Sequence, residues 1–389
     1  MRKHTIETLG CDFLKKRWSI DKKDLKILTA LDRLGGNASA QQISDYIHDN
    51  MQEKKQTEPI PARTIRYRLS TLIERGLLLP SYLQTDERRV GLGEGVLLLQ
   101  EGSGMSQILE KLIQSIPIFY WYVPTHGKYD GYLVHTVFDI KKPEMILKIT
   151  KAMKEKGIIK DFAFFDIVDN ASKKIDFTKF RPNGSWVCDW NEWMSTIESN
   201  LTETKVAPFN LKEDHSVIEY DWSDIMILRV LKNDADSTMN SLASITGLPI
   251  QHVRERVQKL REKGVIKGYA RAYGFVGDLL WFSCFMRIRQ HADGILKCIQ
   301  DLPFPGVVLM ENRHNYCVRF GLTTSNLKRF LDGFRFFRPH LEYYYFQFHL
   351  PDIVESKYEA VFDMFDRDTD SWKIPVDDYA SLIRKYKIE

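Results

Sequence analysis

Hydrophobic residues recur at helical spacing in three short segments just after the middle of the chain. The three apolar stripes are Ile225, Leu228 and Leu231; Leu242, Ala243 and Ile245; and Val253, Val257 and Leu260. Spacings of three to four residues place each set on one face of a helix. Gly247 and Pro249 separate the second and third segments, since Gly accepts a left-handed turn and Pro suits a first helical turn. The pattern predicts three short helices.

A strand follows the third helix, because Gly264 ends the helix and Val265-Ile266 are β-branched. Three helices, a Gly-containing turn and a terminal strand pair describe a winged helix-turn-helix. The third helix of this fold lies in the DNA major groove.

The same pattern occurs earlier in the chain, which indicates an internal repeat. Residues 21–28 (DKKDLKIL) correspond to 221–228 (DWSDIMIL), and residues 65–78 correspond to 253–266. A third block, Ser185, Trp186, Trp193, Ser195 and Ile197, corresponds to Ser371, Trp372, Tyr379, Ser381 and Ile383. Three ordered blocks favour duplication over chance, with two units of about 190 residues and the second starting near Tyr220. The first copy alone has a polar insertion, 48–59, which we expect to extend its second helix or form a long exposed loop.

Basic and amide side chains on the two third helices are the candidate DNA contacts. They are Arg63, Thr64, Arg66, Tyr67 and Arg68 in the first copy, and Gln251, His252, Arg254, Glu255, Gln258 and Lys259 in the second. Arg and Gln side chains can make bidentate hydrogen bonds to base edges, and the remaining Lys and Arg side chains can neutralise phosphates. The alternative is that these residues are solvated faces of amphipathic helices. Arg68 and Arg256 rank lower as base readers, because each follows a core position by three residues and can fold back on its own domain.

The second part of each unit alternates strands and helices in the order βαββαβ. In the first copy the segments are 96–99, 108–116, 119–123, 132–138, 143–156 and 162–168; in the second they are 282–288, 295–302, 307–310, 316–322, 327–337 and 343–348. This order is the ferredoxin-like arrangement, an antiparallel sheet with two helices on one face, so the fold class is α+β. Each winged helix-turn-helix domain is called a head. The expected domains are a first head at 1–90, a first βαββαβ domain at 91–170, a connector at 171–219, a second head at 220–275, a second βαββαβ domain at 276–350 and a tail at 351–389.

Aromatic residues are dense in these strands, notably at 119–122 and 343–346. Because the helices cover one face of each sheet, we expect the other faces to pack together as an intramolecular pseudo-dimer. The sequence does not decide whether two such chains also form a homodimer. RNA bases stacked on the aromatics are disfavoured, since the basic and Gly pattern of RNA-binding sheets is missing.

Composition narrows the classes of protein. With 389 residues, 43% hydrophobic content and a net charge of +4, the chain is neither disordered nor a histone-like polycation. No signal-like or membrane-spanning apolar run occurs, so we expect a cytoplasmic protein without membrane contact. Five scattered cysteines offer neither a disulfide framework nor a metal site. No phosphate loop, nucleophile elbow or paired-carboxylate motif points to an enzyme, and no cofactor is expected.

The residues resemble the leucine-responsive regulatory protein/AsnC (Lrp/AsnC) family of transcription regulators, most strongly over 221–269. Residues 125–133 look like the family's Gly-x-Tyr-Asp hairpin, and the resemblance implies that Gly127, Tyr129 and Asp130 lie near a small-molecule effector site. Asn312–Tyr316 lacks this glycine and aspartate. The expected function is therefore a sequence-specific regulator whose two unlike heads read an asymmetric site on double-stranded DNA.

Two alternatives remain. Siroheme decarboxylases resemble the same architecture, and His126, His135, His314 and Arg313 are the candidates for a tetrapyrrole cleft. The chain could also be an effector-sensing scaffold with vestigial heads. The Trp-rich segments after each unit, with Trp186, Trp190, Trp193, Trp372 and Tyr379, are expected to anchor each tail on its own domain, with partner binding as the alternative.

Overall fold

The computed structural model describes residues 20–51, 60–181, 185–202, 209–213, 215–274, 279–350 and 356–386. Cys11 and most of the predicted insertion, 52–59, lie outside these ranges. The cysteines within them, Cys188, Cys284, Cys298 and Cys317, are free thiols. No helix of the described ranges is long and apolar enough to cross a membrane, and no group of His, Cys, Asp and Glu in them could hold a metal ion.

Each head consists of three helices, as the sequence predicts. They are α1 (Lys22–Leu34), α2 (Ala40–Asn50) and α3 (Ala62–Glu74) in the first head, and α7 (Trp222–Asn233), α8 (Met239–Thr246) and α9 (Ile250–Glu262) in the second. Asp21 and Asp221 each begin a helix with a capping box to the aspartate three residues on, which explains the repeated Asp-x-x-Asp. Gly247 ends α8 with φ +70°, the left-handed turn expected of it.

The strand of each head pairs with the strand of the other head. β1 (Leu78–Thr85) and β7 (Ile266–Tyr273) form a two-stranded antiparallel ribbon, with Tyr82 opposite Ala270. The expectation of a strand pair within each head is therefore wrong. A head contributes one strand after its third helix, and the backbone groups of that strand are satisfied by the equivalent strand of the other head.

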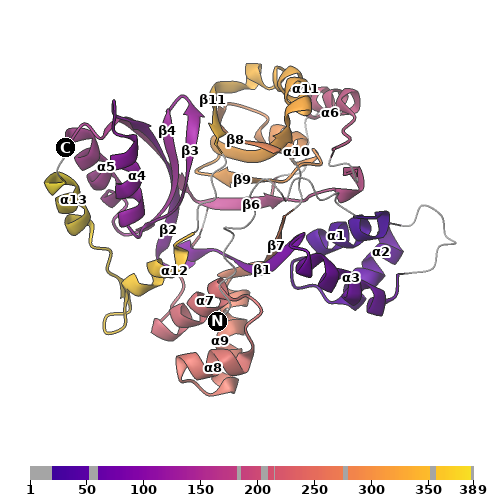
Figure 1. Cartoon of the computed structure of the whole chain (residues 1–389), viewed down its shortest axis with the longest axis horizontal. Coiled ribbons are helices and arrows are strands. Elements are labelled where there is room, and N and C mark those ends of the chain that lie inside the picture. The colour runs from indigo at the N-terminus through magenta and orange to yellow at the C-terminus, as the bar shows by residue number, and fades with distance from the viewer. Residues whose placement is uncertain are drawn as a thin grey trace.

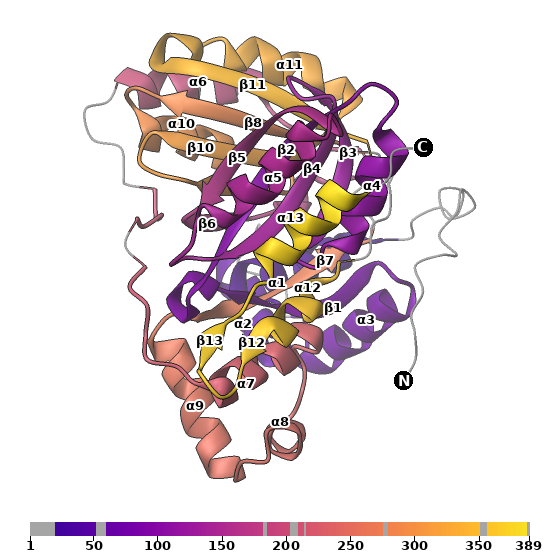
Figure 2. The same cartoon turned by 90° about the vertical axis from the view of Figure 1, so that its left-hand side faces the viewer.

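The two βαββαβ domains are joined in one nine-stranded sheet (Figures 1 and 2). The first domain contains β2 (Leu92–Glu101), α4 (Ser106–Ser115), β3 (Phe119–Gly127), β4 (Gly131–Asp139), α5 (Met145–Glu155) and β5 (Ile159–Ile167). The second contains β8 (Leu279–Ile288), α10 (Ala292–Gln300), β9 (Gly306–Met310), β10 (Asn315–Thr323), α11 (Thr324–Phe334) and β11 (Leu341–His349). The strand order is β5-β2-β4-β3-β11-β8-β10-β9-β6, so the ferredoxin-like order occurs twice.

The inner faces of the two halves of this sheet share one buried cluster. Phe165 of β5 contacts Phe285 of β8, with ring centroids 5.7 Å apart, and both belong to the cluster. Of the aromatic run at 343–346, Tyr345 points to this cluster, whereas Tyr344 and Phe346 pack beneath α11. Tyr345 thus serves the contact between domains while its two neighbours in the strand face the helix, as strand alternation requires.

The tails cross over to the other unit. β6 (Asp169–Lys173) pairs with β9, and α6 (Trp190–Thr202) packs on α10 and α11 of the second domain. The C-terminal α13 (Val376–Lys385) packs on α5 of the first domain. The expectation that each tail docks on its own domain is wrong. The physical reason is that β6 extends the edge of the second sheet and carries the connector to that domain.

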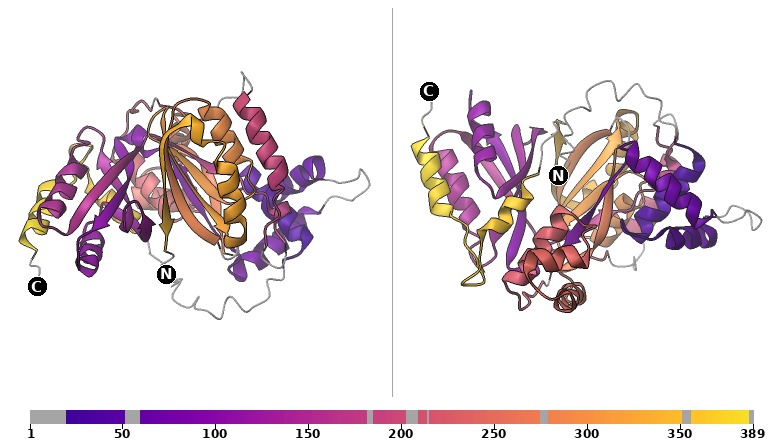
Figure 3. Two further views of the ribbon diagram at one scale, coloured as in Figure 1. Left: turned by 90° about the horizontal axis from the view of Figure 1, so that it is seen from above. Right: turned by 60° about the horizontal axis from the view of Figure 1, so that its bottom comes forward.

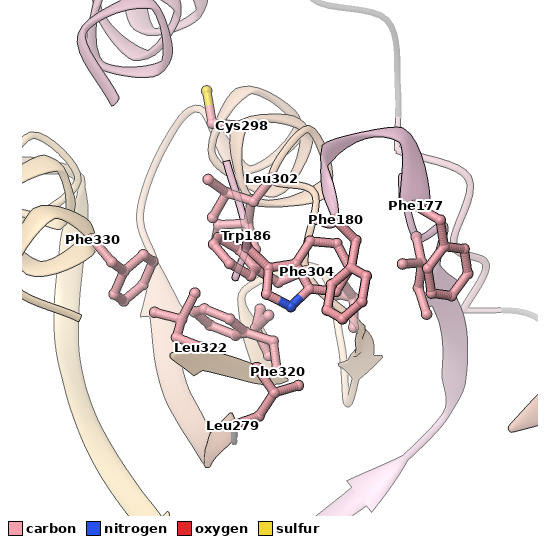
Figure 4. Packing of buried hydrophobic residues seen from close by; sticks show 14 of the residues in the cluster. Phe177, Phe180, Trp186, Leu279, Cys298, Leu302, Phe304, Phe320, Leu322 and Phe330 are labelled. Atoms are coloured by element: carbon pink, nitrogen blue, oxygen red, sulfur yellow. The ribbon is translucent and has the colours of Figure 1, made fainter. Parts of the chain in front are cut away.

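Short elements complete each tail in a matching way: η4 (Phe177–Lys179) in the connector, and α12 (Tyr358–Val361), η6 (Phe362–Met364), β12 (Phe365–Asp366) and β13 (Ser371–Trp372) at the C-terminus. Trp186 packs between Phe180 and Phe304, as Figure 4 shows. Phe180 and Trp186 lie 5.0 Å apart between ring centroids, and Phe365 and Trp372 lie 5.1 Å apart. The third repeated block therefore forms the same contact twice.

Two main cores each draw on both units. One combines residues of α1–α3 and the connector with the helix-covered face of the second domain. The other combines residues of α7–α9 and the C-terminal tail with the helix-covered face of the first domain. Each head is therefore fixed to a body that the two halves of the chain build together.

Candidate nucleic-acid interface

Both heads lie on one side of the sheet, with the β1–β7 ribbon between them (Figures 1 and 3). The third helices, α3 and α9, each bury one apolar side in their own head. The buried residues are Ile65 and Leu72 in α3, and Val253, Val257 and Leu260 in α9. The opposite sides of these helices are free to meet an extended partner.

Exposed residues of α3 form the first candidate contact surface. Arg63 and Arg66 are exposed and form no ion pair with any described residue. Tyr67 is 72% exposed, which is unusual for a large aromatic side chain on a folded surface. Thr64, beside Arg63, is half-buried. These four residues present two guanidinium groups and one ring on a single helix face.

Arg68 and Arg256 are turned toward their own heads, as their positions in the repeat predict. Arg68 Nη1 lies 2.8 Å from Asp21 Oδ2 and 2.7 Å from Asp24 Oδ1. Arg256 Nη2 lies 2.7 Å from Asp221 Oδ2, and Nη1 lies 2.9 Å from Asp224 Oδ1. Because these guanidinium groups hold the first helix onto the third, they stabilise the head.

The exposed residues of α9 differ from those of α3. Gln251 donates a hydrogen bond to Glu255 at 2.9 Å, and Gln258 donates one to Glu262 at 2.8 Å. Lys259 is drawn toward Asp224, 3.5 Å away. Arg254 and His252 are exposed and have no ion-pair partner in the described part of the chain. The second surface is thus mixed in charge, whereas the first is basic.

Comparison with known proteins identifies these heads. A family model for winged helix-turn-helix DNA-binding domains matches residues 223–267. The chain is 38% identical over 122 residues to the HTH-type transcriptional regulator FL11 of Pyrococcus horikoshii, a match that covers 30% of this chain and 80% of that protein. The chain belongs to the Lrp/AsnC family.

Two further likenesses are more limited. The leucine-responsive regulatory protein of Rhizobium meliloti is 38% identical over 85 residues, which are 21% of this chain and 53% of that protein. Among solved structures, the siroheme decarboxylase NirDL is similar with a TM-score of 0.46 and 11% identity, over 87% of this chain and 96% of that one. That likeness is too distant to assign an activity.

The Lrp/AsnC-like hairpin of the first domain packs against the second domain. Tyr129 is 8% exposed, and its ring lies 6.1 Å from that of Tyr345 on β11. Asp130 Oδ1 accepts a hydrogen bond from the Gly127 amide at 3.1 Å. Gly127 has φ +152°, and a Cβ there would lie 2.4 Å from the Phe346 carbonyl oxygen, so the hairpin can approach β11 this closely only with glycine. Gly127 and Tyr129 therefore lie at the boundary between domains, whereas Asp130 is exposed on the hairpin.

The four candidates for a tetrapyrrole cleft occupy different places. His126 is exposed beside Asp130. Arg313 Nε lies 2.7 Å from Glu213 Oε2 of the connector, and His314 is in the same turn. His135 is half-buried where the two domains face each other, and it contacts Arg319. The structure therefore does not gather these four side chains in one cleft.

Sequence reasoning missed a polar network around His135. Arg319 Nη2 donates to His135 Nε2 at 2.6 Å, so the Nδ1 proton of His135 is directed to the Tyr120 hydroxyl at 3.2 Å. Tyr120 in turn donates to Glu94 Oε1 at 3.1 Å. Burial, and then the charge of Arg319, holds the pKa of His135 well below its usual value, so the imidazole is neutral.

The repeat contained the signal that would have found Arg319. Register against β2 places Val96 opposite His135, and register against β8 places Ser283 opposite Arg319. His135 and Arg319 therefore occupy corresponding positions on the third strand of each domain. Aligning the two copies would have drawn attention to this pair of unlike polar residues on two otherwise apolar strands.

Proposed function

We propose that this chain is a DNA-binding transcription regulator in which two unlike heads read the two halves of an asymmetric site. The observation that carries the proposal is the contrast between the third helices. The exposed surface of α3 presents Arg63, Arg66 and Tyr67, whereas that of α9 presents Arg254 and His252 beside two Gln–Glu pairs. Unlike side chains in two major grooves select unlike sequences.

One chain supplies both heads and the body that holds them. The paired β1 and β7 strands and the cluster between the sheets support an intramolecular pseudo-dimer, the product of a tandem duplication. Covalent linkage raises the effective concentration of the second head after the first has bound. We therefore propose that a second copy of the chain is not required for binding one site.

A small-molecule effector is part of the proposal, as the family resemblance implies. Gly127 and Tyr129 lie where the hairpin meets β11, and Tyr129 and Tyr345 line a cavity of about 230 Å³ there. Asp130 is exposed and holds the hairpin through the Gly127 amide. A ligand there would act on the contact between the two domains.

Binding to DNA is tested by fluorescence anisotropy against genomic fragments over a salt series. The variant Arg63→Ala/Arg66→Ala/Arg254→Ala is compared with Arg289→Ala, an exposed arginine on the second βαββαβ domain. Phosphate contacts release counterions, so the logarithm of affinity should fall linearly with the logarithm of salt concentration. Loss of affinity in the triple variant alone supports the proposal. Binding that is absent, insensitive to salt, or equal in both variants contradicts it.

A further inference from the structure

A cavity of about 580 Å³ lies between the first head and the sheets. Its walls come from the C-terminal end of α1, the β1–β7 ribbon, β6 and the strands β8 to β10. His135 of β4 also lines it, beside Arg319 of β10. Ligand pockets for small organic molecules typically measure about 300–1,000 Å³. The cavity is therefore large enough for such a molecule.

Two guanidinium groups face this cavity without an acidic partner. Arg319 bonds neutral groups, namely His135 and the Ser283 hydroxyl at 3.4 Å, and its cation lies 5.3 Å from the centre of the Trp121 ring. Arg271 donates to the carbonyl oxygens of Gly36 at 2.7 Å and Leu79 at 3.2 Å. Neither arginine forms an ion pair with a carboxylate of the described ranges. Positive charge that is partly buried and unpaired favours an anionic ligand.

Asp32, the one carboxylate among the described residues of the wall, is already engaged. Asp32 Oδ2 accepts a hydrogen bond from the Ile175 amide at 2.9 Å, and Oδ1 accepts one from the Tyr273 hydroxyl at 3.2 Å. The ammonium group of an amino acid would thus find no free acceptor of opposite charge among the described residues of the wall. Trp281, Tyr82 and Tyr269 contribute aromatic side chains to the lining residues. These features suit a flat, unsaturated carboxylate that lacks an amino group.

The corresponding place beside the second head is closed. Lys232 of α7 stands where α1 has Asp32, and its Nζ lies 2.6 Å from Glu87 Oε1. The Tyr358 ring covers the same ammonium group at 4.7 Å. The space left near Glu87 and Glu94 is about 20 Å³. The two halves of the chain therefore differ at this point, and one of them is open to a ligand.

We propose that the cavity beside the first head binds a small aromatic carboxylate, with Arg319 as the inner anchor and Arg271 at the ribbon. One ligand binds per chain. The site is separate from the hairpin of Gly127, Tyr129 and Asp130, because none of these three residues lines it and Tyr129 lines a different cavity.

Such a ligand would act on the first head. Gly36, in the turn after α1, donates its amide to Tyr269 of the ribbon at 2.7 Å, and a Cβ at Gly36 would lie 2.5 Å from the Ala270 carbonyl carbon. The turn is thus held tightly on β7, and both line the cavity. Regulation of the head through this contact rests on the proposed function in DNA binding, whereas ligand binding itself does not.

Isothermal titration of the full chain with 2-naphthoate tests the site without DNA. The two probes for comparison are 2-naphthamide, which lacks the charge, and 3-(2-naphthyl)alanine, which carries an ammonium group and has two more carbon atoms between ring and carboxylate. The variants are Arg319→Gln, which keeps an amide donor for His135, and Arg271→Gln. Arg287→Gln on β8, whose partner is Glu342 at 3.0 Å, is the control.

We expect 2-naphthoate to bind with one site per chain and both comparison probes to bind at least about tenfold more weakly. The amide loses the charged hydrogen bond to arginine, and the ammonium group adds a positive charge beside the two arginines. Arg319→Gln and Arg271→Gln should each weaken 2-naphthoate about tenfold, and Arg287→Gln should not. If Arg319→Gln does not fold by circular dichroism, Arg271→Gln decides. Equal affinity for 2-naphthoate and 2-naphthamide, unchanged affinity in Arg271→Gln, or no saturable binding at millimolar 2-naphthoate overturns the proposal. Binding of 2-naphthoate by a chain that does not bind DNA would leave this site intact and contradict only its regulatory role.

Discussion

Trp193 of the connector donates its indole N–H to the backbone carbonyl of Cys298, 2.7 Å away, in the other half of the chain. The indole also stacks on Phe330, with centroids 6.0 Å apart, and is 5% exposed. At the opposite end of the molecule, Trp372 of the tail donates to the Val90 carbonyl, also at 2.7 Å. Both contacts fix the tail of one unit onto the other unit.

Removal of the Trp193 side chain should therefore destabilise the whole chain. We expect Trp193→Ala to lower the free energy of unfolding by about 3–5 kcal/mol, the usual cost of truncating a buried Trp. Val187→Ala, at a side chain that is 38% exposed, is the control and should change it by less than about 0.5 kcal/mol. Urea denaturation followed by circular dichroism measures both. Equal midpoints for the two variants would show that the connector is not part of the core.

Crossed tails and paired strands also predict how a divided chain behaves. When the chain is cut between Thr202 and Phe209 and the halves are produced together, they should purify as one complex. Each half should aggregate when produced alone. The strands β1 and β6 would lose their backbone hydrogen-bond partners, and α6 would lose the helices that cover its apolar face. Size-exclusion chromatography checks this. Two halves that are each soluble, monomeric and helical would contradict the shared cores.

Arg254 and Arg256 should separate DNA binding from stability, although they stand two positions apart on α9. Arg254→Ala removes an exposed cation and should weaken DNA binding about tenfold or more with the melting temperature unchanged. Arg256→Ala leaves the buried Asp224 without its close guanidinium partner and should cost about 1–3 kcal/mol of stability. Anisotropy and thermal melting are measured for both. The assignment of roles fails if Arg254→Ala melts early and binds normally.

His215 predicts a pH dependence of stability. Its Nδ1 lies 2.5 Å from Asp86 Oδ2 and its Nε2 lies 2.8 Å from the Lys212 carbonyl. The hydrogen bond to Asp86, opposed by burial and aided by the charges of Asp86 and Asp169, raises the pKa of His215. Because the folded pKa exceeds the unfolded value of about 6.5, this stabilisation is complete below about pH 6.5 and is lost as the pH rises through the folded pKa.

The matched comparison is His215→Gln against His252→Gln, which alters an exposed histidine on α9. His215→Gln should reduce the melting temperature relative to the unmutated chain near pH 6 and by clearly less near pH 9. Arg89 and Lys267, which pair with Asp86 and Asp169, are present in all three proteins and cancel in the comparison. A deficit that is the same at both pH values would contradict the raised pKa.

The sequence was informative wherever structure is local. Helix order, the turn at Gly247 and the capping pairs at Asp21 and Asp221 all follow from spacings of a few residues. Strand partners across units could not be predicted, because both copies offer the same strand and the same apolar face. Whether a strand pairs within its own copy or with the other copy depends on where the connecting chain runs. In this protein β6 runs to the second domain and pairs with β9.

The same distinction applies to the candidate sites. Arg68 and Arg256 could be set apart from the candidate DNA contacts, since their position relative to a core residue recurs in both heads. Arg319 was missed because a lone arginine in one strand gives no signal until the two copies are aligned. Its importance comes from meeting His135, which is distant in sequence, where the two domains face each other.

We propose that one chain places its two unlike heads on one asymmetric DNA site. Hydroxyl-radical footprinting of a selected genomic site, with the number of chains per duplex measured by native mass spectrometry, tests it most directly. We predict one chain per duplex, loss of protection in one half-site with Arg63→Ala/Arg66→Ala, and loss in the other half-site with Arg254→Ala. Two chains per duplex, or equal loss in both half-sites for each variant, would contradict the account.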